Sequence, residues 1–209
     1  RATPYLYSPQ DIADLISATT ILRSGAHHRA TYRTLIGVLA VTGMRVGEAI
    51  GLDRDDFDAV KGMLTIRNGK FGKFRELPLH PTVVTALQDY LRRDDRPHQA
   101  GTSALLSCSA GRRLRYQNVQ PTFQKLLHHC SISPRSAACR PRIHDLRHGF
   151  AVNTIIDGYK AGEPGSRMAI LSTYLGHVDP ANTYWYLSAA PELLGLAGDR
   201  LERHLGGDA

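Results

Sequence analysis

The stretch TGMRVGEAIGL, Thr42 to Leu52, is the part of the sequence from which the fold is most easily worked out. An apolar stripe with helical spacing runs from about residue 28 to Thr42 and stops at Gly43, a residue type common where a helix ends in left-handed backbone. The segment after Gly43 then begins a second, short helix. Arg45 lies at its start, where unpaired backbone amides favour an anion, so the sequence predicts a phosphate-binding position there.

On either side of this turn the pattern is mostly helical. Ser8 and Pro9 are typical of a helix start, and Asp179-Pro180 opens a later helix. Apolar spacing predicts further helices at residues 81–93, 116–130, 142–159, 165–176 and 191–205. Between Phe57 and Leu79 the pattern alternates instead, which predicts three short strands, DDFDA, MLTIRN and FRELPL, with GKFGK before the last. We therefore expect a mainly α fold with a small three-stranded antiparallel β-sheet (α+β).

The composition is that of a globular protein with a basic surface. Of its 209 residues, 42% are hydrophobic and 22% are charged, which excludes a disordered or fibrous chain. The net charge of +7 comes from 21 arginines and five lysines against 19 acidic residues. Arginine grips phosphate oxygens with a planar fork, so nucleic acid is the first partner to consider. A genome that favours arginine codons would explain the same bias.

Cysteine and hydropathy patterns exclude other classes. The three cysteines, Cys108, Cys130 and Cys139, have no CxxC spacing, which argues against a disulfide framework. No apolar run reaches the roughly 18 residues of a membrane-spanning helix, so we expect no membrane partner and a cytoplasmic protein.

The motif HDLRH places His144 and Arg147 three residues apart, on one face of a predicted helix, where one site can use both. His144 and His148 could instead be metal ligands with Cys130, Cys139, His128 and His129. A helical zinc-hydrolase motif requires glutamate directly after the first histidine, where this sequence has Asp145, and we expect no metal.

The stretch HVDPANTYWY, His177 to Tyr186, places the only tryptophan between two tyrosines. Tyr184 and Tyr186 are two residues apart and face different sides of a helix, so only one can reach a shared site. Tyr184 and Trp185 are interpreted as packing residues.

Taken together, TGMRVGEAIGL, the lysine of NGKFGK, HDLRH, YLGH and a tyrosine nine residues after its histidine resemble, in the same order, the motifs of tyrosine recombinases, the phage-integrase family. The resemblance spans Thr42 to Tyr186. It implies a catalytic set of two arginines, a lysine, two histidines and a tyrosine nucleophile, which are Arg45, Arg147, Lys70, His144, His177 and Tyr186.

The chemistry of these residues agrees with that implied role. Fixed cations at Arg45 and Arg147 can meet the charge that grows on phosphate oxygens during phosphodiester cleavage. A phenol, with a pKa of about 10, needs nearby positive charge or a base, for which His144 and His177 are candidates whose roles the sequence leaves open. Lys70 can protonate the leaving 5′ oxygen.

Lys73 is the rival to Lys70, and the family's pattern favours the first lysine. We expect Lys73, Arg67 and Arg75 to contact the DNA backbone, as well as Arg142 in the arginine-rich loop before HDLRH. Glu48, one turn from Arg45, is expected to orient it, and Asp145 to brace its helix or a nearby arginine.

The resemblance also implies a domain organisation, an activity and partners. We expect residues 1–8 to be a linker from a missing N-terminal DNA-binding domain, 9–190 the catalytic domain, and 191–209 a C-terminal helix that packs in cis or is exchanged between protomers. The implied activity is site-specific cutting and rejoining of DNA through a covalent 3′-phosphotyrosine, without ATP or metal. The implied partners are double-stranded DNA and three further protomers in a tetramer on synapsed DNA, with a monomer in isolation, on the nucleoid of a bacterium. A type IB topoisomerase-like enzyme and a catalytically inactive DNA-binding relative are the alternatives.

Overall fold

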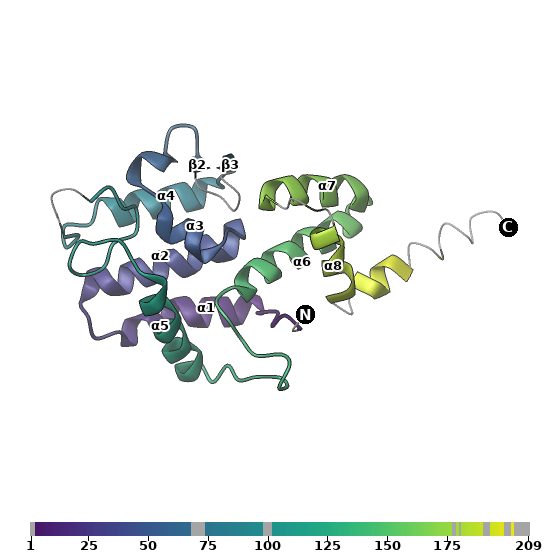
Figure 1. Cartoon of the computed structure of the whole chain (residues 1–209), viewed down its shortest axis with the longest axis horizontal. Coiled ribbons are helices and arrows are strands. Elements are labelled where there is room, and N and C mark those ends of the chain that lie inside the picture. Colours follow the sequence, from purple (N-terminus) through teal and green to yellow (C-terminus); the bar gives the residue numbers. More distant parts are fainter. Residues whose placement is uncertain are drawn as a thin grey trace.

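The computed structural model describes residues 3–67, 74–97, 102–176, 179, 181–189, 193–198 and 202. It is mainly helical with one small antiparallel sheet, which confirms the predicted fold class (Figure 1). The helices are α1 (Pro9–Ala18), α2 (Ala26–Thr42), α3 (Val46–Gly51), α4 (Pro81–Leu91), α5 (Tyr116–His129), α6 (Asp145–Lys160), α7 (Pro164–Leu175) and α8 (Ala181–Ala189), with short 3₁₀ turns η1 (Thr19–Ile21) and η2 (Arg54–Asp56). The strands are β1 (Phe57–Asp58), β2 (Met63–Ile66) and β3 (Arg75–Pro78).

The sheet has the order β1-β2-β3, with both pairs antiparallel. Leu64 pairs with Leu77, and both are fully buried, whereas Met63 and Thr65 on the other face of β2 are half-buried. This alternation is the one expected of a sheet with one face on the core. The predicted first strand shrinks from DDFDA to two residues because Arg54–Asp56 form η2 instead.

The N-terminal segment is packed against the body. Ser8 caps α1 by accepting a hydrogen bond from the Asp11 amide, while the Asp11 carboxylate accepts one from Ser8, a reciprocal capping box. Just before it, Tyr5 and Tyr7 are buried, and the Tyr7 hydroxyl donates to the carbonyl of Arg142 at 3.0 Å. Residues 3–8, expected to be a linker, therefore lie on the core and support the loop that leads into α6.

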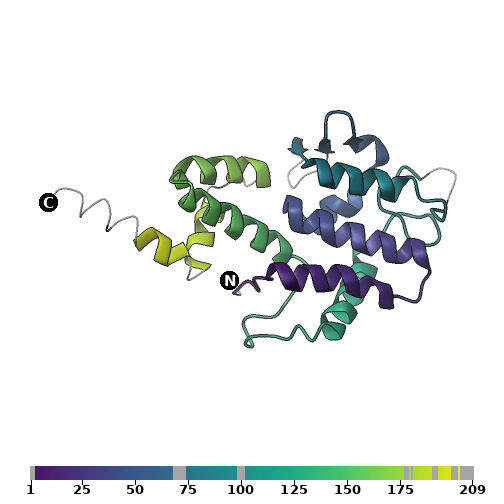
Figure 2. The same cartoon turned by 180° about the vertical axis from the view of Figure 1, so that it is seen from behind.

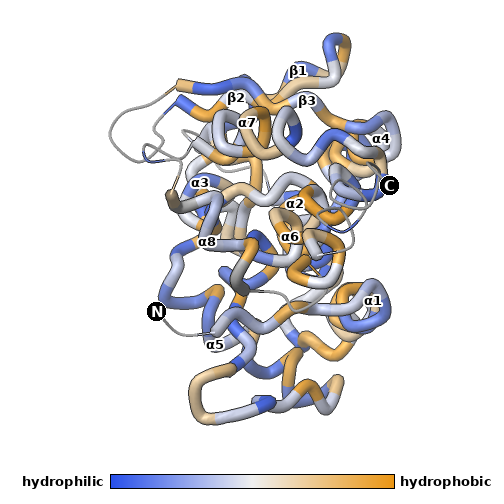
Figure 3. Tube along the Cα trace, turned by 90° about the vertical axis from the view of Figure 1, so that its right-hand side faces the viewer, coloured by the Kyte–Doolittle hydropathy of each residue, from blue (hydrophilic) through white to orange (hydrophobic). Residues whose placement is uncertain are grey.

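Two hydrophobic clusters lie on either side of the start of α6. The larger one contains α1 to α5 and the sheet, with Tyr32, Leu35 and Phe123 among its largest buried side chains. The smaller one joins α6 to α7 and α8. Figure 2 shows α1 lying along α2, and Figure 3 shows hydrophobic segments of α2 and α6 at the middle of the molecule. Because α6 packs on α2 and on α7, it carries the HDLRH residues to the junction of the two clusters.

Gly43 allows α2 and α6 to approach each other closely at that junction. It ends α2 in the left-handed conformation, with φ +58°, and a Cβ built on it would lie 2.4 Å from Cδ1 of Phe150 in α6. Gly43→Ala is expected to lower the free energy of unfolding by about 2–4 kcal/mol, because it adds left-handed strain to overpacking. Gly37→Ala in the same helix, where a Cβ meets nothing within 4 Å, is the control and should stabilise by about 0.5–1 kcal/mol. Equal effects in denaturant unfolding would contradict this interpretation.

The C-terminal prediction is only partly within the described chain. Residues 193–198 of the predicted helix 191–205 are helical, and Leu193 is buried in the smaller cluster. Over the described residues, none of the helices combines the length and the apolar character needed to cross a bilayer.

Candidate active site

Arg45 is positioned by the sharp turn between α2 and α3. After left-handed Gly43 the backbone becomes extended at Arg45, the residue that precedes α3. Glu48 accepts a hydrogen bond from the Arg45 amide at 2.8 Å and another from its guanidinium Nη1 at 2.8 Å. The Arg45 side chain keeps 26% of its surface exposed. Glu48 thus orients the guanidinium from one side, and the other side is open to solvent.

Glu48 is shared with a second arginine. Arg75 in β3 donates from Nη2 to Oε2 at 2.7 Å and from Nη1 to Oε1 at 3.1 Å, and its side chain is 10% exposed. Burial opposes ionisation of Glu48, but the hydrogen bonds from Arg75 and Arg45 outweigh it and lower the pKa of Glu48. Arg75, expected to contact the DNA backbone from the surface, instead lies in a buried ion pair that links the sheet to α3. The end of α7 reaches the same place, because a Cβ at Gly176 would lie 3.2 Å from Nη1 of Arg75.

Arg147 is the most deeply buried cation of the site, with 3% of its surface exposed. Its Nη1 donates to the carbonyl of Gly43 and its Nη2 to that of Leu175, both at 2.8 Å. These carbonyls end α2 and α7, where the helix dipoles favour positive charge. Burial, and next the charge of Arg45, lower the pKa of Arg147 to about 10, against the opposing influence of Tyr186 and Glu48. The guanidinium therefore stays charged at neutral pH.

The residues around His144 form a second polar group. Asp145 is fully buried and accepts hydrogen bonds from the Arg142 amide at 2.9 Å and from its Nη2 at 2.9 Å. His144 precedes α6 and keeps exposed surface, with its ring 5.0 Å from that of His148. Its partial burial and the nearby positive charges of His148 and Arg147 lower the pKa of His144 to about 4. A neutral ring at this place can donate one hydrogen bond and is a weak base.

The depressed pKa of His144 makes stability depend on pH. The folded chain binds its proton near pH 4, whereas an unfolded histidine binds one near its usual value of about 6.5. Between those values the unfolded state holds more protons, so stability is full above the unfolded pKa and is lost as the pH falls toward 4. His144→Gln is expected to show a smaller decline over this window in denaturant unfolding. Exposed His128→Gln is the control, and identical pH slopes in all three proteins would contradict the prediction.

Tyr186 and Tyr184 lie on opposite sides of α8, as predicted. Tyr184 is 59% exposed and is therefore not the packing residue that the sequence indicated, while Tyr186 is 2% exposed. The Tyr186 hydroxyl and Nδ1 of His148 are joined by a hydrogen bond of 3.2 Å. Trp185 is half-buried and packs beside both rings.

His148 is the site residue whose role sequence reasoning missed. The sequence indicated it only as a partner of His144 in a metal pair, because its contact with Tyr186 joins residues 38 positions apart. Across the part of the chain that the structure describes, no group of three or more His, Cys, Asp or Glu side chains is arranged to hold a metal ion.

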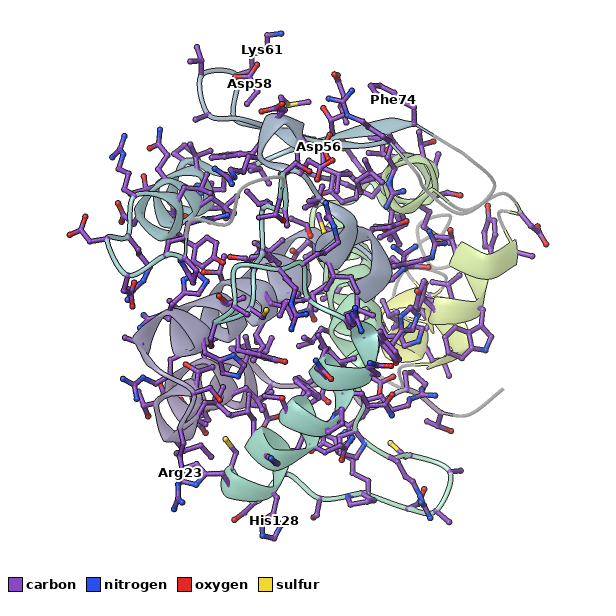
Figure 4. All side chains as sticks on the ribbon, turned by 60° about the vertical axis from the view of Figure 1, so that its left-hand side comes forward. Arg23, Asp56, Asp58, Lys61, Phe74 and His128 are labelled. Carbon is purple, nitrogen blue, oxygen red and sulfur yellow. The ribbon has the colours of Figure 1, made fainter. Side chains whose placement is uncertain are left out.

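Several expected site residues lie elsewhere. Lys70, Lys73 and His177 fall outside the described residues. Arg67 follows β2 and is paired with Asp56, and its side chain is 60% exposed. Figure 4 shows Asp58 and Lys61, at the turn between β1 and β2, pointing away from the body. Of the proposed residues that are described, Arg45, Glu48, Arg147 and Tyr186 come together at the meeting point of α3, α6 and α8, with Arg75 of β3 beside them.

Comparison with known sequences finds relatives from one family. The sequence profile of the Phage integrase family matches residues 7–192. The putative integrase/recombinase y4rB of Sinorhizobium fredii is 42% identical over 97% of this chain and 67% of its own length. Its relative y4rE from the same organism is 36% identical over 94% of this chain and 64% of its own. Tyrosine recombinase XerA of Pyrococcus furiosus is 31% identical over 84% of this chain and 57% of its own. The chain thus spans about two thirds or less of the length of these relatives.

Solved structures show the same fold. The crystal structure of XerA recombinase matches 95% of this chain and 64% of that chain with a TM-score of 0.71 at 23% identity. The XerH site-specific recombinase bound to its palindromic difH substrate, a post-cleavage complex, matches 96% of this chain and 54% of that chain with a TM-score of 0.70 at 21% identity.

Proposed function

Since this chain belongs to the phage integrase family, we propose that it is the catalytic domain of a site-specific recombinase that cuts and rejoins DNA through a covalent 3′-phosphotyrosine. Tyr186 is the nucleophile. Its oxygen replaces the 5′ oxygen of the scissile bond, and the energy of that bond is kept in the new ester. Rejoining therefore needs neither ATP nor a metal ion.

The observation that carries this proposal is the meeting of three groups from separate elements. Arg45 precedes α3, Arg147 is on α6 and Tyr186 is on α8, and both Arg45 and Tyr186 act electrostatically on Arg147. Two oriented guanidinium groups near a phenol are what in-line attack on a phosphodiester needs, because charge develops on the non-bridging oxygens as the phenolate approaches.

The remaining proposed roles follow from the same chemistry. Arg45 and Arg147 bind the non-bridging oxygens, and neutral His144 donates a hydrogen bond to one of them. Glu48 orients Arg45, and Asp145 holds Arg142, which with Lys73 and Arg67 contacts the DNA backbone. Lys70 protonates the leaving 5′ oxygen, and His177 assists at the phosphate; these two roles rest on the motif resemblance.

The assembly we propose is a tetramer of protomers on two DNA duplexes, each cutting one strand, with the isolated chain a monomer. Residues 1–8 link the catalytic domain to an N-terminal DNA-clamping domain, and residues 191–209 exchange between protomers in the assembly. Action on chromosomal DNA places the protein on the nucleoid, in the bacterial cytoplasm.

The test is a nicked duplex in which the short fragment that carries the new 5′-hydroxyl diffuses away after cleavage, so that the covalent intermediate accumulates. The full-length protein, incubated with it in EDTA and without nucleotide, is expected to yield a protein–DNA adduct that survives denaturing electrophoresis. Peptide mapping of the adduct should place the DNA on Tyr186. A mapped linkage to another residue, or no adduct on any duplex carrying the protein's own target site, would overturn the proposal.

DNA binding by residues 1–209 alone should be dominated by charge. The net charge of +7 favours release of counterions from the duplex, and the fragment is expected to bind with little sequence preference. If about four to six phosphates are contacted, affinity should fall by roughly 10²–10³ between 50 and 200 mM salt. Fluorescence anisotropy with a labelled duplex measures the slope, and an affinity independent of ionic strength would contradict the prediction.

A further inference from the structure

The structure offers a proton acceptor for Tyr186 other than the two histidines that the motif resemblance implies. Tyr186 and His148 are joined by a hydrogen bond of 3.2 Å between the phenol oxygen and Nδ1, and their ring centroids are 5.5 Å apart. His148 is on the first turns of α6, next in sequence to Arg147, so a ring that touches the nucleophile is fixed to the same helix as the buried arginine.

The other nitrogen of the same ring faces a carboxylate. Nε2 of His148 lies 3.9 Å from Oδ1 of Asp145, which is one helical turn earlier and fully buried. This negatively charged oxygen, which also accepts a hydrogen bond from Nη2 of Arg142, favours the tautomer with the proton on Nε2, in which Nδ1 can accept from the phenol. The same charge stabilises the imidazolium that forms when a proton arrives at Nδ1.

We propose that His148 is the catalytic base that takes the proton of Tyr186, with Asp145 as its positioning residue, a proposal that rests on the function given above. In the step, the O–H bond of Tyr186 breaks and its proton moves to Nδ1 of His148. The phenolate oxygen forms a bond to phosphorus. The bond from phosphorus to the 5′ oxygen breaks, and that oxygen takes its proton from the general acid. Rejoining reverses each transfer.

The neighbouring histidine is less suited to this task. His144 is 5.0 Å away between ring centroids, and the low pKa that its surroundings impose makes it a weak base at neutral pH. His144 also precedes α6 and keeps exposed surface, whereas His148 is half-buried and in contact with the phenol. The two histidines therefore have different roles: His144 donates a hydrogen bond to the phosphate, and His148 receives the proton of Tyr186.

The experiment separates proton removal from leaving-group protonation. The full-length protein is given a nicked duplex whose scissile 5′ oxygen is replaced by sulfur, because a thiolate leaves without needing a proton. His148→Asn keeps a hydrogen-bonding oxygen near the phenol but accepts no proton at neutral pH. Its rate of adduct formation is expected to be about 10²–10⁴ lower than that of the wild type near neutral pH. The deficit should shrink as the pH rises, because hydroxide then removes the phenol proton without help from a histidine.

The control is His128→Asn, which changes an exposed histidine at the end of α5. Figure 4 shows His128 at the opposite end of the molecule from the turn between β1 and β2, and away from α8. The rate of adduct formation in this variant should equal that of the wild type. A wild-type rate in His148→Asn, or a deficit that does not change with pH, would overturn the role of His148 while leaving the proposed function intact. Absence of a wild-type adduct would overturn the proposed function itself.

A second measurement needs no substitution at the site. Nitrogen NMR of the folded protein labelled with ¹⁵N-histidine reports which ring nitrogen carries the proton. The proposal requires that neutral His148 be protonated on Nε2 and bare on Nδ1. Protonation of Nδ1 in the neutral ring would exclude His148 as the acceptor of the phenol proton.

Discussion

Arg147→Lys is expected to slow adduct formation by about 10²–10³ and to destabilise the fold by about 1–3 kcal/mol. The guanidinium of Arg147 donates to the carbonyls of Gly43 and Leu175 at the same time, each at 2.8 Å. An ammonium group keeps the charge but is a single point, so it reaches one carbonyl and leaves the other buried without a donor. The substitution also removes the other N–H groups of the guanidinium, which we propose bind the phosphate.

The two effects can be measured apart. Denaturant unfolding gives the stability, and adduct formation on the nicked duplex, at a temperature where the variant is fully folded, gives the rate. Arg23→Lys is the control, because Arg23 is exposed and points outward near the far end of the body (Figure 4). If Arg147→Lys cleaves at the wild-type rate, Arg147 is a structural cation and the proposed phosphate site is wrong.

The fold was largely predictable because its signals are local. Gly43 ends α2 in left-handed backbone, and Ser8 begins α1 with a capping box. Each signal depends on only a few neighbouring residues, so the sequence alone predicts it. The alternation that places Leu64 and Leu77 on the buried face of the sheet is equally local. The errors are also local, since Arg54–Asp56 form a 3₁₀ turn in place of the start of a strand.

The grouping of three proposed site residues was predictable from the motifs, but the contacts that position them were not. Order along the chain indicated Arg45, Arg147 and Tyr186 together, and the structure gathers them. The ion pair of Arg75 with Glu48 joins residues 27 apart, and the contact of His148 with Tyr186 joins residues 38 apart. Neither has a periodicity that would reveal it, because such pairs depend on how β3 meets α3 and how α8 meets α6. An arginine with 10% of its side chain exposed has the same sequence signal as one on the surface.

Tyr186→Phe is expected to abolish the adduct while leaving the fold and DNA binding close to those of the wild type. Phenylalanine fills the same buried space between α6 and α8, so the packing of the smaller hydrophobic cluster is preserved. The hydrogen bond to His148 is lost, which should lower stability by only about 1 kcal/mol. Removal of one oxygen atom thus takes away the atom that would bond to phosphorus and little else.

Tyr184→Phe is the matched control, because it removes the same atom from the same helix at a 59% exposed position. Its adduct should form at the wild-type rate on the nicked duplex. Duplex affinity measured by anisotropy in all three proteins then separates chemistry from binding, since a phenol that served only to hold DNA would weaken affinity and rate together. An adduct that survives Tyr186→Phe and disappears in Tyr184→Phe would move the nucleophile to the exposed face of α8. The arginines could then no longer act on the phosphate that it attacks, because Arg147 is buried on the side of Tyr186.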